Sequence, residues 1–412
     1  MKRLKIGIFG LNRGEEYVDG FLLCDTDIVA VCDFNKKRIE RVLQKLGKDV
    51  AVYNDFAEFI SHPMDVVVIA NYFHEHAQFV IESLKRNLHV FCECSVAVTM
   101  AECVNLVRVA EKSKGIFMLA ENYPFMAFNQ EMKRVCDEGS LGNILYAEGE
   151  YNHPLEPNDK DFYFKYCDSL EHWRNYLPRA YYVTHSLAPL MYVTNATPIR
   201  VTAMPVYAPF EPSFAHGRYV ADRAAIITTL NEDNSVFKIT GCAAFGAHGN
   251  SYRFCGENGQ IENIRGLGNK IMLRYNKWNV PKGQKEINFY EVERKDADEN
   301  LIRQTSHEGA DFLVVREFVD CVRNGRKPVF DIYFAVRLAM VGILAHRSLL
   351  DKGVPYDIPD LHLESERINY ENDKLSPFAI HDRENLIPCC SNPEYKPSQE
   401  QLENYLKMIN KE

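Results

Sequence analysis

Apolar and polar positions alternate with two periods over the first 120 residues. Short β-rich runs predict strands at residues 5–9, 28–32, 50–52, 65–70, 89–92 and 116–119. Helical patterns separate the runs, for example at residues 75–86 and 100–113, and Thr99 and Glu102 have capping-box spacing at the start of the second. This alternation predicts a parallel sheet with right-handed crossovers. The continuously apolar run at residues 66–70 indicates a sheet covered on both faces.

The pattern changes after about residue 123. A helix at residues 128–138 ends at Gly139, and helical segments return at residues 311–324 and 333–352. Between them, longer strands are predicted at residues 144–151, 199–207, 224–230, 236–244, 251–256 and 259–263. We expect a large, mostly antiparallel, open sheet.

Three regions are therefore predicted, because 412 residues exceed one ordinary core. Residues 1–123 form a doubly wound α/β domain of Rossmann type, and residues 124–370 form an α+β domain that binds substrate. Residues 371–412 are a polar C-terminal extension, rich in Pro and Asn, that packs on the body or on a neighbouring subunit. Its final helix has a capping box at Ser398 and Gln401.

Composition and charge exclude several partners. The chain is 46% hydrophobic and 25% charged, which is ordinary for a globular protein. A net charge of −9 and a pI near 5.9 argue against nucleic acid or an anionic membrane as partner. No apolar run is expected to span a bilayer, and the apolar start is too short for a signal peptide.

The twelve cysteines indicate a cytoplasmic protein. They are scattered, form no CxxC pair and lie mostly inside apolar runs, as do Cys32, Cys92, Cys242 and Cys321. This pattern is typical of buried, reduced thiols and predicts neither disulfides nor a zinc site.

A glycine-rich turn follows the first predicted strand. Residues 7–14 read Gly-Ile-Phe-Gly-Leu-Asn-Arg-Gly, so backbone N–H groups near Gly10, Asn12 and Arg13 can approach a pyrophosphate at a helix N-terminus. The match to GxGxxG is imperfect, because Asn12 replaces the middle glycine and Gly14 comes one residue early. A tight structural turn is the alternative.

Asp33 strengthens the interpretation as a dinucleotide site. It ends the second strand, about 20 residues downstream of the turn, where an acid binds the ribose hydroxyls of adenosine. Its charge repels a 2′-phosphate and favours NAD, although Lys36 and Lys37 leave NADP open. The alternative role for Asp33 is a helix cap.

These features together resemble the Gfo/Idh/MocA oxidoreductase superfamily over residues 4–360. The resemblance also rests on residues 71–76, 89–95 and 139–144, and it implies cofactor contacts from Asn71, His76 and Glu93. The family's Glu-Lys-Pro signature is changed here, since Cys94 and Ser95 replace Lys and Pro. That lysine assists proton transfer in the family, so its role is vacant or moved. A small neutral wall is favoured for Cys94 over a reactive thiolate.

Three further segments resemble the NAD-dependent glycosidases of this superfamily, such as the α-N-acetylgalactosaminidases. They are residues 121–123, 182–189 and 307–311. The resemblance places Asn122 at the cofactor, Tyr182 and His185 at the nicotinamide and the sugar, and His307 and Asp311 at the substrate.

The residue types of the second segment suit the same chemistry. Tyr182 and His185 are three apart and face one side of a helix start, where such a pair can remove a hydroxyl proton as hydride leaves the same carbon. A core histidine with an aromatic neighbour is the alternative. His153, Trp173 and Arg174 are candidate sugar contacts. His153, His185 and His307 lack tight ligand spacing, so no metal is predicted.

The sequence thus predicts an NAD-dependent oxidoreductase that transfers hydride between nicotinamide and a carbinol carbon of a sugar, glycoside or cyclic polyol. The first alternative is a glycosidase that retains NAD as an internal redox cofactor. The second is a catalytically silent NAD-binding sensor. The resemblance also implies a homodimer or homotetramer.

Overall fold

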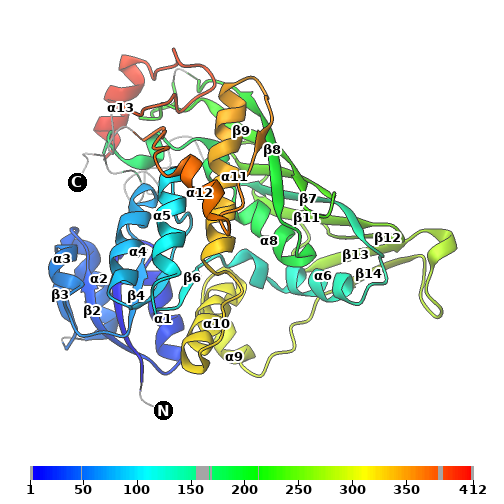
Figure 1. Cartoon of the computed structure of the whole chain (residues 1–412), viewed down its shortest axis with the longest axis horizontal. Helices are drawn as coiled ribbons and strands as arrows, with labels where there is room; N and C mark the ends of the chain where they lie inside the picture. The colour runs from blue at the N-terminus through cyan, green and yellow to red at the C-terminus, as the bar shows by residue number, and fades with distance from the viewer. Residues whose placement is uncertain are drawn as a thin grey trace. The chain divides into compact units, whose positions relative to one another are not determined.

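The computed structural model describes residues 3–47, 49–154, 167, 169–211, 213–378 and 384–409. The chain forms two compact units (Figure 1). Unit 1 comprises residues 1–130, 293–339 and 361–372, and unit 2 comprises residues 131–292, 340–360 and 373–412.

Unit 1 is built on a six-stranded parallel sheet in the order β3-β2-β1-β4-β5-β6 (Figure 1). Its strands are β1 Lys5–Phe9, β2 Asp27–Cys32, β3 Ala51–Tyr53, β4 Val66–Ile69, β5 His89–Cys92 and β6 Phe117–Leu119. All four residues of β4 are buried, as expected for a strand covered on both faces. The strand order reverses between β1 and β4, and ligands of doubly wound folds bind at this switch point. The predicted Rossmann-type sheet is confirmed.

Helices connect these strands: α1 Glu15–Leu23, α2 Lys36–Leu46, α3 Phe56–Phe59, α4 His76–Lys85 and α5 Met100–Ala110. The predicted capping box of α5 is present. Thr99 Oγ1 accepts the Glu102 N–H at 3.1 Å, and the Glu102 carboxylate accepts the Thr99 N–H at 3.0 Å. Two donors at the helix start are thereby satisfied.

Unit 1 also includes α9 Glu299–Ile302, η6 His307–Gly309, α10 Ala310–Asn324 and α12 Glu364–Tyr370. The sequence had assigned these residues to the substrate-binding domain. They cluster with unit 1 because α10 packs closely on α1. A Cβ on Gly20 would lie 3.3 Å from Val315, and the Phe21 and Phe318 rings are 6.4 Å apart.

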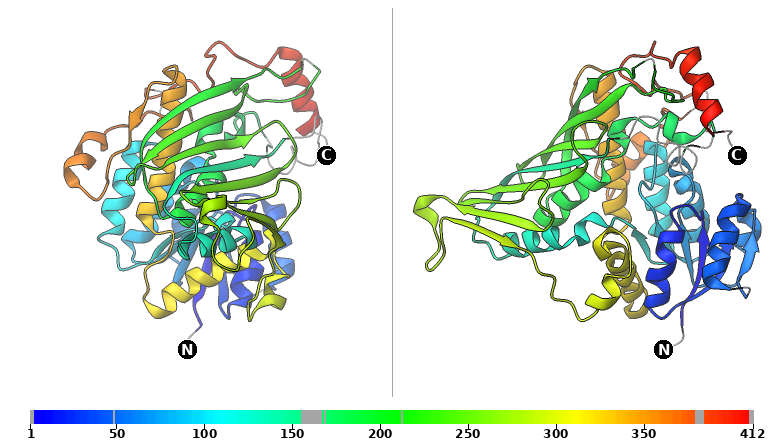
Figure 2. Two further views of the ribbon diagram at one scale, coloured as in Figure 1. Left: turned by 90° about the vertical axis from the view of Figure 1, so that its right-hand side faces the viewer. Right: turned by 180° about the vertical axis from the view of Figure 1, so that it is seen from behind.

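Unit 2 is built on a nine-stranded sheet in the order β14-β13-β12-β11-β7-β10-β9-β8-β15 (Figure 2). The strands are β7 Ile144–Asn152, β8 Pro198–Tyr207, β9 Asp222–Asn231, β10 Val236–Ala243, β11 Gly249–Gly256, β12 Gly259–Asn263, β13 Lys270–Tyr275, β14 Ile287–Glu291 and β15 Tyr356–Asp357. Only β7 and β10 pair in parallel, so the predicted mostly antiparallel sheet is confirmed. The last three strands were not predicted.

Glycines let the helix α8, Thr184–Thr194, lie directly on this sheet. A Cβ on Gly149 of β7 would lie 2.0 Å from the Ser186 carbonyl oxygen, and one on Gly241 of β10 would lie 2.8 Å from the Arg179 carbonyl oxygen. Any larger residue would push the helix start and the preceding turn, η4 Arg179–Tyr181, off the sheet. These close approaches position Tyr182 and His185 against β7.

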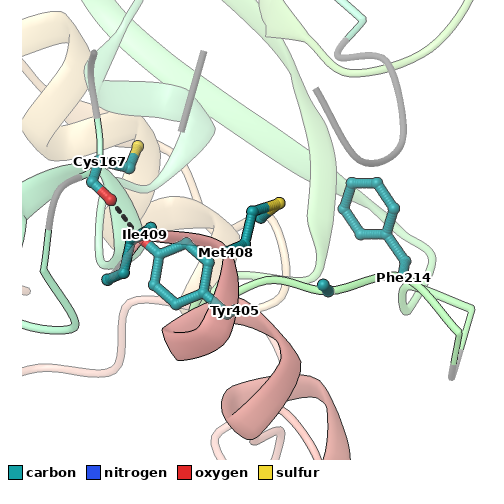
Figure 3. Close-up of a cluster of buried hydrophobic side chains, with 6 residues drawn as sticks. Cys167, Phe214, Tyr405, Met408 and Ile409 are labelled. Carbon is teal, nitrogen blue, oxygen red and sulfur yellow. Dashed lines mark hydrogen bonds between the residues drawn. The ribbon is translucent and has the colours of Figure 1, made fainter. Parts of the chain in front are cut away.

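The C-terminal extension packs on unit 2. Helix α13, Gln399–Ile409, starts with the predicted capping box, in which the Gln401 N–H donates to Ser398 Oγ at 3.2 Å. Its Tyr405, Met408 and Ile409 form a buried cluster with Cys167, Phe214 and Ala215 (Figure 3). The Tyr405 hydroxyl donates to the Cys167 carbonyl oxygen. Of the two predicted docking places, the body of the same chain is confirmed.

Two sequence expectations concern the core. All twelve cysteines lie among the described residues, and none of them forms a disulfide bond there. Helix α11, Ile332–Leu350, is long and apolar enough by composition to cross a membrane, so the prediction that no such run exists is wrong. Of the most apolar part of this helix, 83% is buried inside the protein, as in a core helix.

Candidate functional site

The β1–α1 turn of unit 1 is tightly enclosed. Gly10 has φ +88°, and a Cβ there would lie 2.4 Å from the carbonyl carbon of Ala70 at the end of β4. The Gly10 N–H donates to the Cys32 carbonyl oxygen at 2.9 Å, which fixes the turn beside β2 as well. Only glycine satisfies both conditions. The turn therefore brings bare backbone to the switch point of the sheet.

Two asparagine side chains beside this turn fit a polar ligand. Asn12 lies in the turn and Asn71 follows β4, and the side-chain oxygen of each is buried without a hydrogen-bond partner in the described part of the chain. Buried acceptors are normally satisfied. A dinucleotide has the hydroxyl and amide donors that could satisfy them, so the turn and its neighbours fit this cofactor.

Asp33 ties the turn to β2. Its Oδ2 accepts the Leu11 N–H at 2.7 Å and its Oδ1 accepts the Asn35 N–H at 2.8 Å. The cap of α2 is Asn35, which accepts the N–H groups of Lys37 and Arg38 at 3.0 and 3.3 Å, so the helix-cap alternative for Asp33 is wrong. Each oxygen of Asp33 has accepting capacity left, and its contact with ribose stays a prediction.

Five of the predicted site residues meet in one buried network of unit 1, which we call the Asp311 network: Arg13, Glu93, Asn122, His307 and Asp311. Arg13 Nη1 and Nη2 donate to Asp311 at 3.1 and 2.8 Å, and its Nε donates to Glu93 at 2.9 Å. Asn122 Nδ2 donates to Asp311 at 2.7 Å, and His307 Nδ1 lies 2.9 Å from the same carboxylate. Ser306 and Tyr17, which the sequence did not indicate, add hydroxyl donors to Asp311 and Glu93.

This network is balanced in charge. Burial alone would raise the pKa of Asp311, but Arg13 and His307 outweigh it and hold the pKa well below its usual range. Burial would lower the pKa of Arg13, yet Tyr17, Asp311 and Glu93 raise it well above the ordinary value. Arg13 and Asp311 are therefore both ionised, and the network orders the α10 start against the β1–α1 turn.

His76 joins the loops that follow β4 and β5. Its Nδ1 lies 2.8 Å from the Ser95 carbonyl oxygen and its Nε2 lies 3.3 Å from the Asn71 carbonyl oxygen. Burial lowers the pKa of His76, so the ring is neutral. It holds Asn71 and Ser95 in place beside the switch point.

Cys94 is a small buried residue between two carboxylates. Its Sγ donates to Glu121 Oε2 at 3.1 Å, its N–H donates to Glu93, and it is 6% exposed. The Cys94–Ser95 peptide bond is cis. Glu121 is fully buried and was missed as a single residue, although the sequence marked the segment 121–123 at the end of β6. The expected neutral wall agrees with this burial.

Unit 2 brings Tyr182 and His185 into contact. The Tyr182 hydroxyl lies 3.2 Å from His185 Nε2, and the rings are perpendicular. Tyr151 of β7 packs edge-on against His185, with ring centroids 5.1 Å apart. His153 stacks on Tyr151 at 5.8 Å, and its Nδ1 lies 3.1 Å from Nδ1 of His248, which the sequence did not indicate. Burial first, then His248 and nearby arginines, lowers the pKa of His153 to about 4, so this ring is neutral at pH 7.

Trp173 and Arg174 contact each other in the same unit. The Arg174 guanidinium lies 4.3 Å from the Trp173 ring centroid, and Trp173 is 7% exposed. His307 belongs to unit 1, whereas His153 and His185 belong to unit 2. No group of three or more His, Cys, Asp or Glu side chains suited to a metal ion occurs among the residues searched, which are those that the structure describes.

The switch-point turn and the parallel sheet define a dinucleotide-binding oxidoreductase domain. Residues 4–121 match the Gfo/Idh/MocA oxidoreductase family with its NAD-binding Rossmann fold. Residues 269–365 match the C-terminal domain of glycosyl hydrolase 109. The chain thus joins a region similar to the NAD-binding domain of Gfo/Idh/MocA oxidoreductases to a region similar to the C-terminal domain of glycosyl hydrolase 109.

Relatives along the sequence carry glycosidase names. The chain is 25% identical over 396 residues to glycosyl hydrolase family 109 protein 1 of Shewanella sp. strain ANA-3, covering 87% of this chain and 85% of that protein. It is 24% identical over 396 residues, with the same coverage, to an α-N-acetylgalactosaminidase of Shewanella oneidensis.

Similar solved structures carry oxidoreductase names. Levoglucosan dehydrogenase in complex with NADH and levoglucosan superposes with a TM-score of 0.70 at 14% identity, covering 87% of this chain and all of that one. An Agrobacterium radiobacter oxidoreductase in complex with NAD+, L-tartaric acid and magnesium has a TM-score of 0.68 at 14% identity, covering 86% of this chain and 98% of that one. At such identities the likeness establishes the fold, an α/β Rossmann domain followed by a large open sheet.

Proposed function

We propose that this protein is a glycosidase that uses tightly held NAD as an internal redox cofactor. The observation that carries the proposal is the Tyr182–His185 pair, whose oxygen and nitrogen lie 3.2 Å apart. The glycosyl hydrolase 109 match and the glycosidase names of the relatives support the same choice.

The residues divide the work as follows. NAD supplies a group that accepts and returns a hydride at a sugar carbon. Gly10, Asn12, Asn71 and Asp33 bind the dinucleotide, and the Asp311 network holds the loops around it. Tyr182 Oη accepts the proton of the sugar hydroxyl and passes it to His185 Nε2, a transfer that the hydrogen bond between them permits.

The oxidised sugar is a ketone, and its neighbouring C–H is acidic. Removal of that proton expels the group two bonds away, which breaks the glycosidic bond by β-elimination. Water then adds to the double bond, and the ketone is reduced back to the hydroxyl. His153 is neutral at pH 7, since its pKa is about 4, and it can accept a hydrogen bond from the sugar without adding charge.

The test uses 4-nitrophenyl N-acetyl-α-galactosaminide and a panel of other nitrophenyl glycosides with the full-length holoprotein. We expect release of nitrophenol without accumulation of NADH. In heavy water the sugar product should carry deuterium on the carbon beside the oxidised one. His185→Ala should lose most activity and keep NAD, and Tyr182→Phe should do the same.

Two results would overturn the proposal. Stoichiometric NADH with an intact glycosidic bond would establish a sugar dehydrogenase, the second candidate, which the oxidoreductase match and the levoglucosan dehydrogenase fold favour. Bound NAD with no turnover of any sugar would instead indicate a silent sensor.

The assembly and the location of the protein stay predictions. A homodimer or homotetramer is expected, and sedimentation equilibrium measures it directly. A cytoplasmic location is expected from the free cysteines, and cell fractionation tests it.

A further inference from the structure

We propose that unit 2 binds an anionic group of the substrate, a carboxylate, phosphate or sulfate on the sugar, through Arg179 and Arg218. The proposal rests on the proposed function, because it assigns the anion to the sugar. These two arginines, together with Arg174 and Arg223, are called the arginine cluster. The chain has more acidic than basic residues, 57 against 48, so two arginines without an ion pair to a described carboxylate, Arg179 and Arg218, are unexpected.

Arg218 is buried without a counter-charge. It is 7% exposed, its Nε has no hydrogen-bond partner within the described ranges, and no carboxylate of those ranges pairs with it. An uncompensated buried cation is costly, so such a group is normally paired with an acid or a ligand.

Arg179, the first residue of η4, is half-buried. Its Nη1 donates to the carbonyl oxygen and Sγ of Cys242 at 3.3 and 3.8 Å, and no ion pair to a described carboxylate is formed. Burial, together with Arg218 and Arg223, lowers the pKa of Arg179 to about 10 against the opposing effect of Cys242. The arginines are thus close enough to repel one another.

The surrounding groups of the described chain neutralise only part of this charge. Burial and the neighbouring Arg218 and Arg223 lower the pKa of His216 to about 3. Its Nδ1 accepts the Arg218 N–H at 3.1 Å, which leaves a proton on the buried Nε2, an atom with no partner in the part of the chain described. Asp222 is the nearby acid; burial raises its pKa, while its hydrogen bonds with Ser391 and the charge of Arg179 lower it. Asp222 can balance one positive charge but not those of both Arg179 and Arg218, so the site keeps donors and net positive charge.

Packing holds Arg218 in place. A Cβ on the preceding Gly217 would lie 2.6 Å from the Tyr405 ring, so α13 lies directly on this segment, beside the cluster shown in Figure 3. On the other side, Tyr219 stacks on Tyr176 at 4.9 Å, and its N–H donates to the Asn175 carbonyl oxygen at 2.8 Å. A buried charge fixed from both sides is preorganised for a ligand.

The arginine cluster adjoins the Tyr182–His185 pair. Arg179 precedes Tyr182 by three residues, and Cys242 links them, since its N–H donates to the Tyr182 carbonyl oxygen at 3.2 Å while its own carbonyl accepts from Arg179. Arg174, Arg179 and His185 all act on the pKa of His153. A sugar at Tyr182 and His185 can therefore place a charged substituent at the arginines, where guanidinium groups bind oxyanions through paired hydrogen bonds.

The experiment measures binding by calorimetry, without turnover, on the full-length protein with NAD. The probes are D-glucuronate, D-glucose 6-phosphate, inorganic sulfate and, as the neutral reference, D-glucose. We expect one of the two anionic sugars to bind at least tenfold more tightly than glucose. Comparison of glucuronate with glucose 6-phosphate then shows whether a carboxylate or a phosphate is preferred. Arg218→Gln and Arg179→Gln should each remove that preference, and Arg218→Lys should retain part of it.

Arg253→Gln is the matched control, because Arg253 lies on β11 of the same unit and pairs with Glu148 at 3.1 Å. It should leave the preference unchanged. Equal affinity for glucose and both anionic sugars would overturn the proposal, whether or not sulfate binds. An unchanged preference for the anionic sugar in Arg218→Gln would also overturn it. Calorimetry measures binding without turnover. Failure of glycoside cleavage and failure of the anion preference are therefore separate results.

Discussion

Two groups of arginines differ in whether they form ion pairs with carboxylates. In the Asp311 network of unit 1, Arg13 pairs with Asp311 and Glu93, whose side chains are 1% and 18% exposed. In the arginine cluster of unit 2, Arg179 and Arg218 meet no described carboxylate within ion-pair distance. The pKa values of the two arginines differ accordingly. The partners of Arg13 raise its pKa, whereas burial and neighbouring arginines lower the pKa of Arg179 to about 10.

The difference separates a structural role from a binding role. The guanidinium of Arg13 is compensated by two carboxylates. It joins segments that are 298 residues apart in the chain. A guanidinium buried without an acid raises the free energy of the folded state until an anion arrives. The contrast can be measured by changing one member of each group.

The largest effect is expected for Asp311→Asn. The change leaves Arg13 without its best partner and weakens the contacts of Asn122, Ser306 and His307. We expect a loss of about 3 kcal/mol in the free energy of unfolding, as for other broken buried ion pairs. Urea denaturation measures it, and a loss below about 0.5 kcal/mol would show that the network is not a structural unit.

The same variant tests the pH dependence of the network. The pKa of Asp311 is lowered in the folded state, so its stabilising effect is fully present above the unfolded value of about 3.9 and is lost as the pH falls below it. The difference in the free energy of unfolding between the native protein and Asp311→Asn should therefore be constant from about pH 5 to about pH 7. It should shrink below about pH 4. A difference that grows on acidification would contradict this sign.

Arg218→Met should have the opposite effect on stability. Replacing an unpaired buried cation by an apolar side chain of similar length should raise the free energy of unfolding by about 1–2 kcal/mol when no anion is present. Arg13→Met is the matched control and should lower it. Thermal and urea unfolding of both variants give the comparison, and a loss in both would mean that Arg218 has a stabilising partner.

The smallest effect concerns the turn that carries His307 into the Asp311 network. Glu308 has φ +54°, a left-handed conformation that disfavours residues with a Cβ, between His307 at φ +51° and Gly309 at φ +85°. Glu308→Gly should raise the free energy of unfolding by about 1 kcal/mol. Glu299→Gly, in the short helix α9, should lower it, and a decrease in both would contradict the strain at Glu308.

Much of the fold could be predicted because it depends on local periodicity. Strands β1, β5 and β12 have the predicted bounds, and both capping boxes form. Strands β13, β14 and β15 were missed; β14 has only exposed and half-buried positions, and β15 is only two residues long. Local patterns also misplaced α10, because its packing on α1 joins distant segments.

Part of the candidate site could likewise be predicted from the sequence, and part could not. The sequence by itself determined the glycine turn, Asp33 at the end of β2 and the Tyr182–His185 spacing, because strand–turn–helix geometry follows from a few neighbouring residues. Only the tertiary structure decided which arginine is paired. Arg13 pairs with Asp311 across 298 positions, whereas Arg179 and Arg218 form no ion pair with a described carboxylate. Charge compensation depends on distances between side chains, and those distances exist only once the chain has folded.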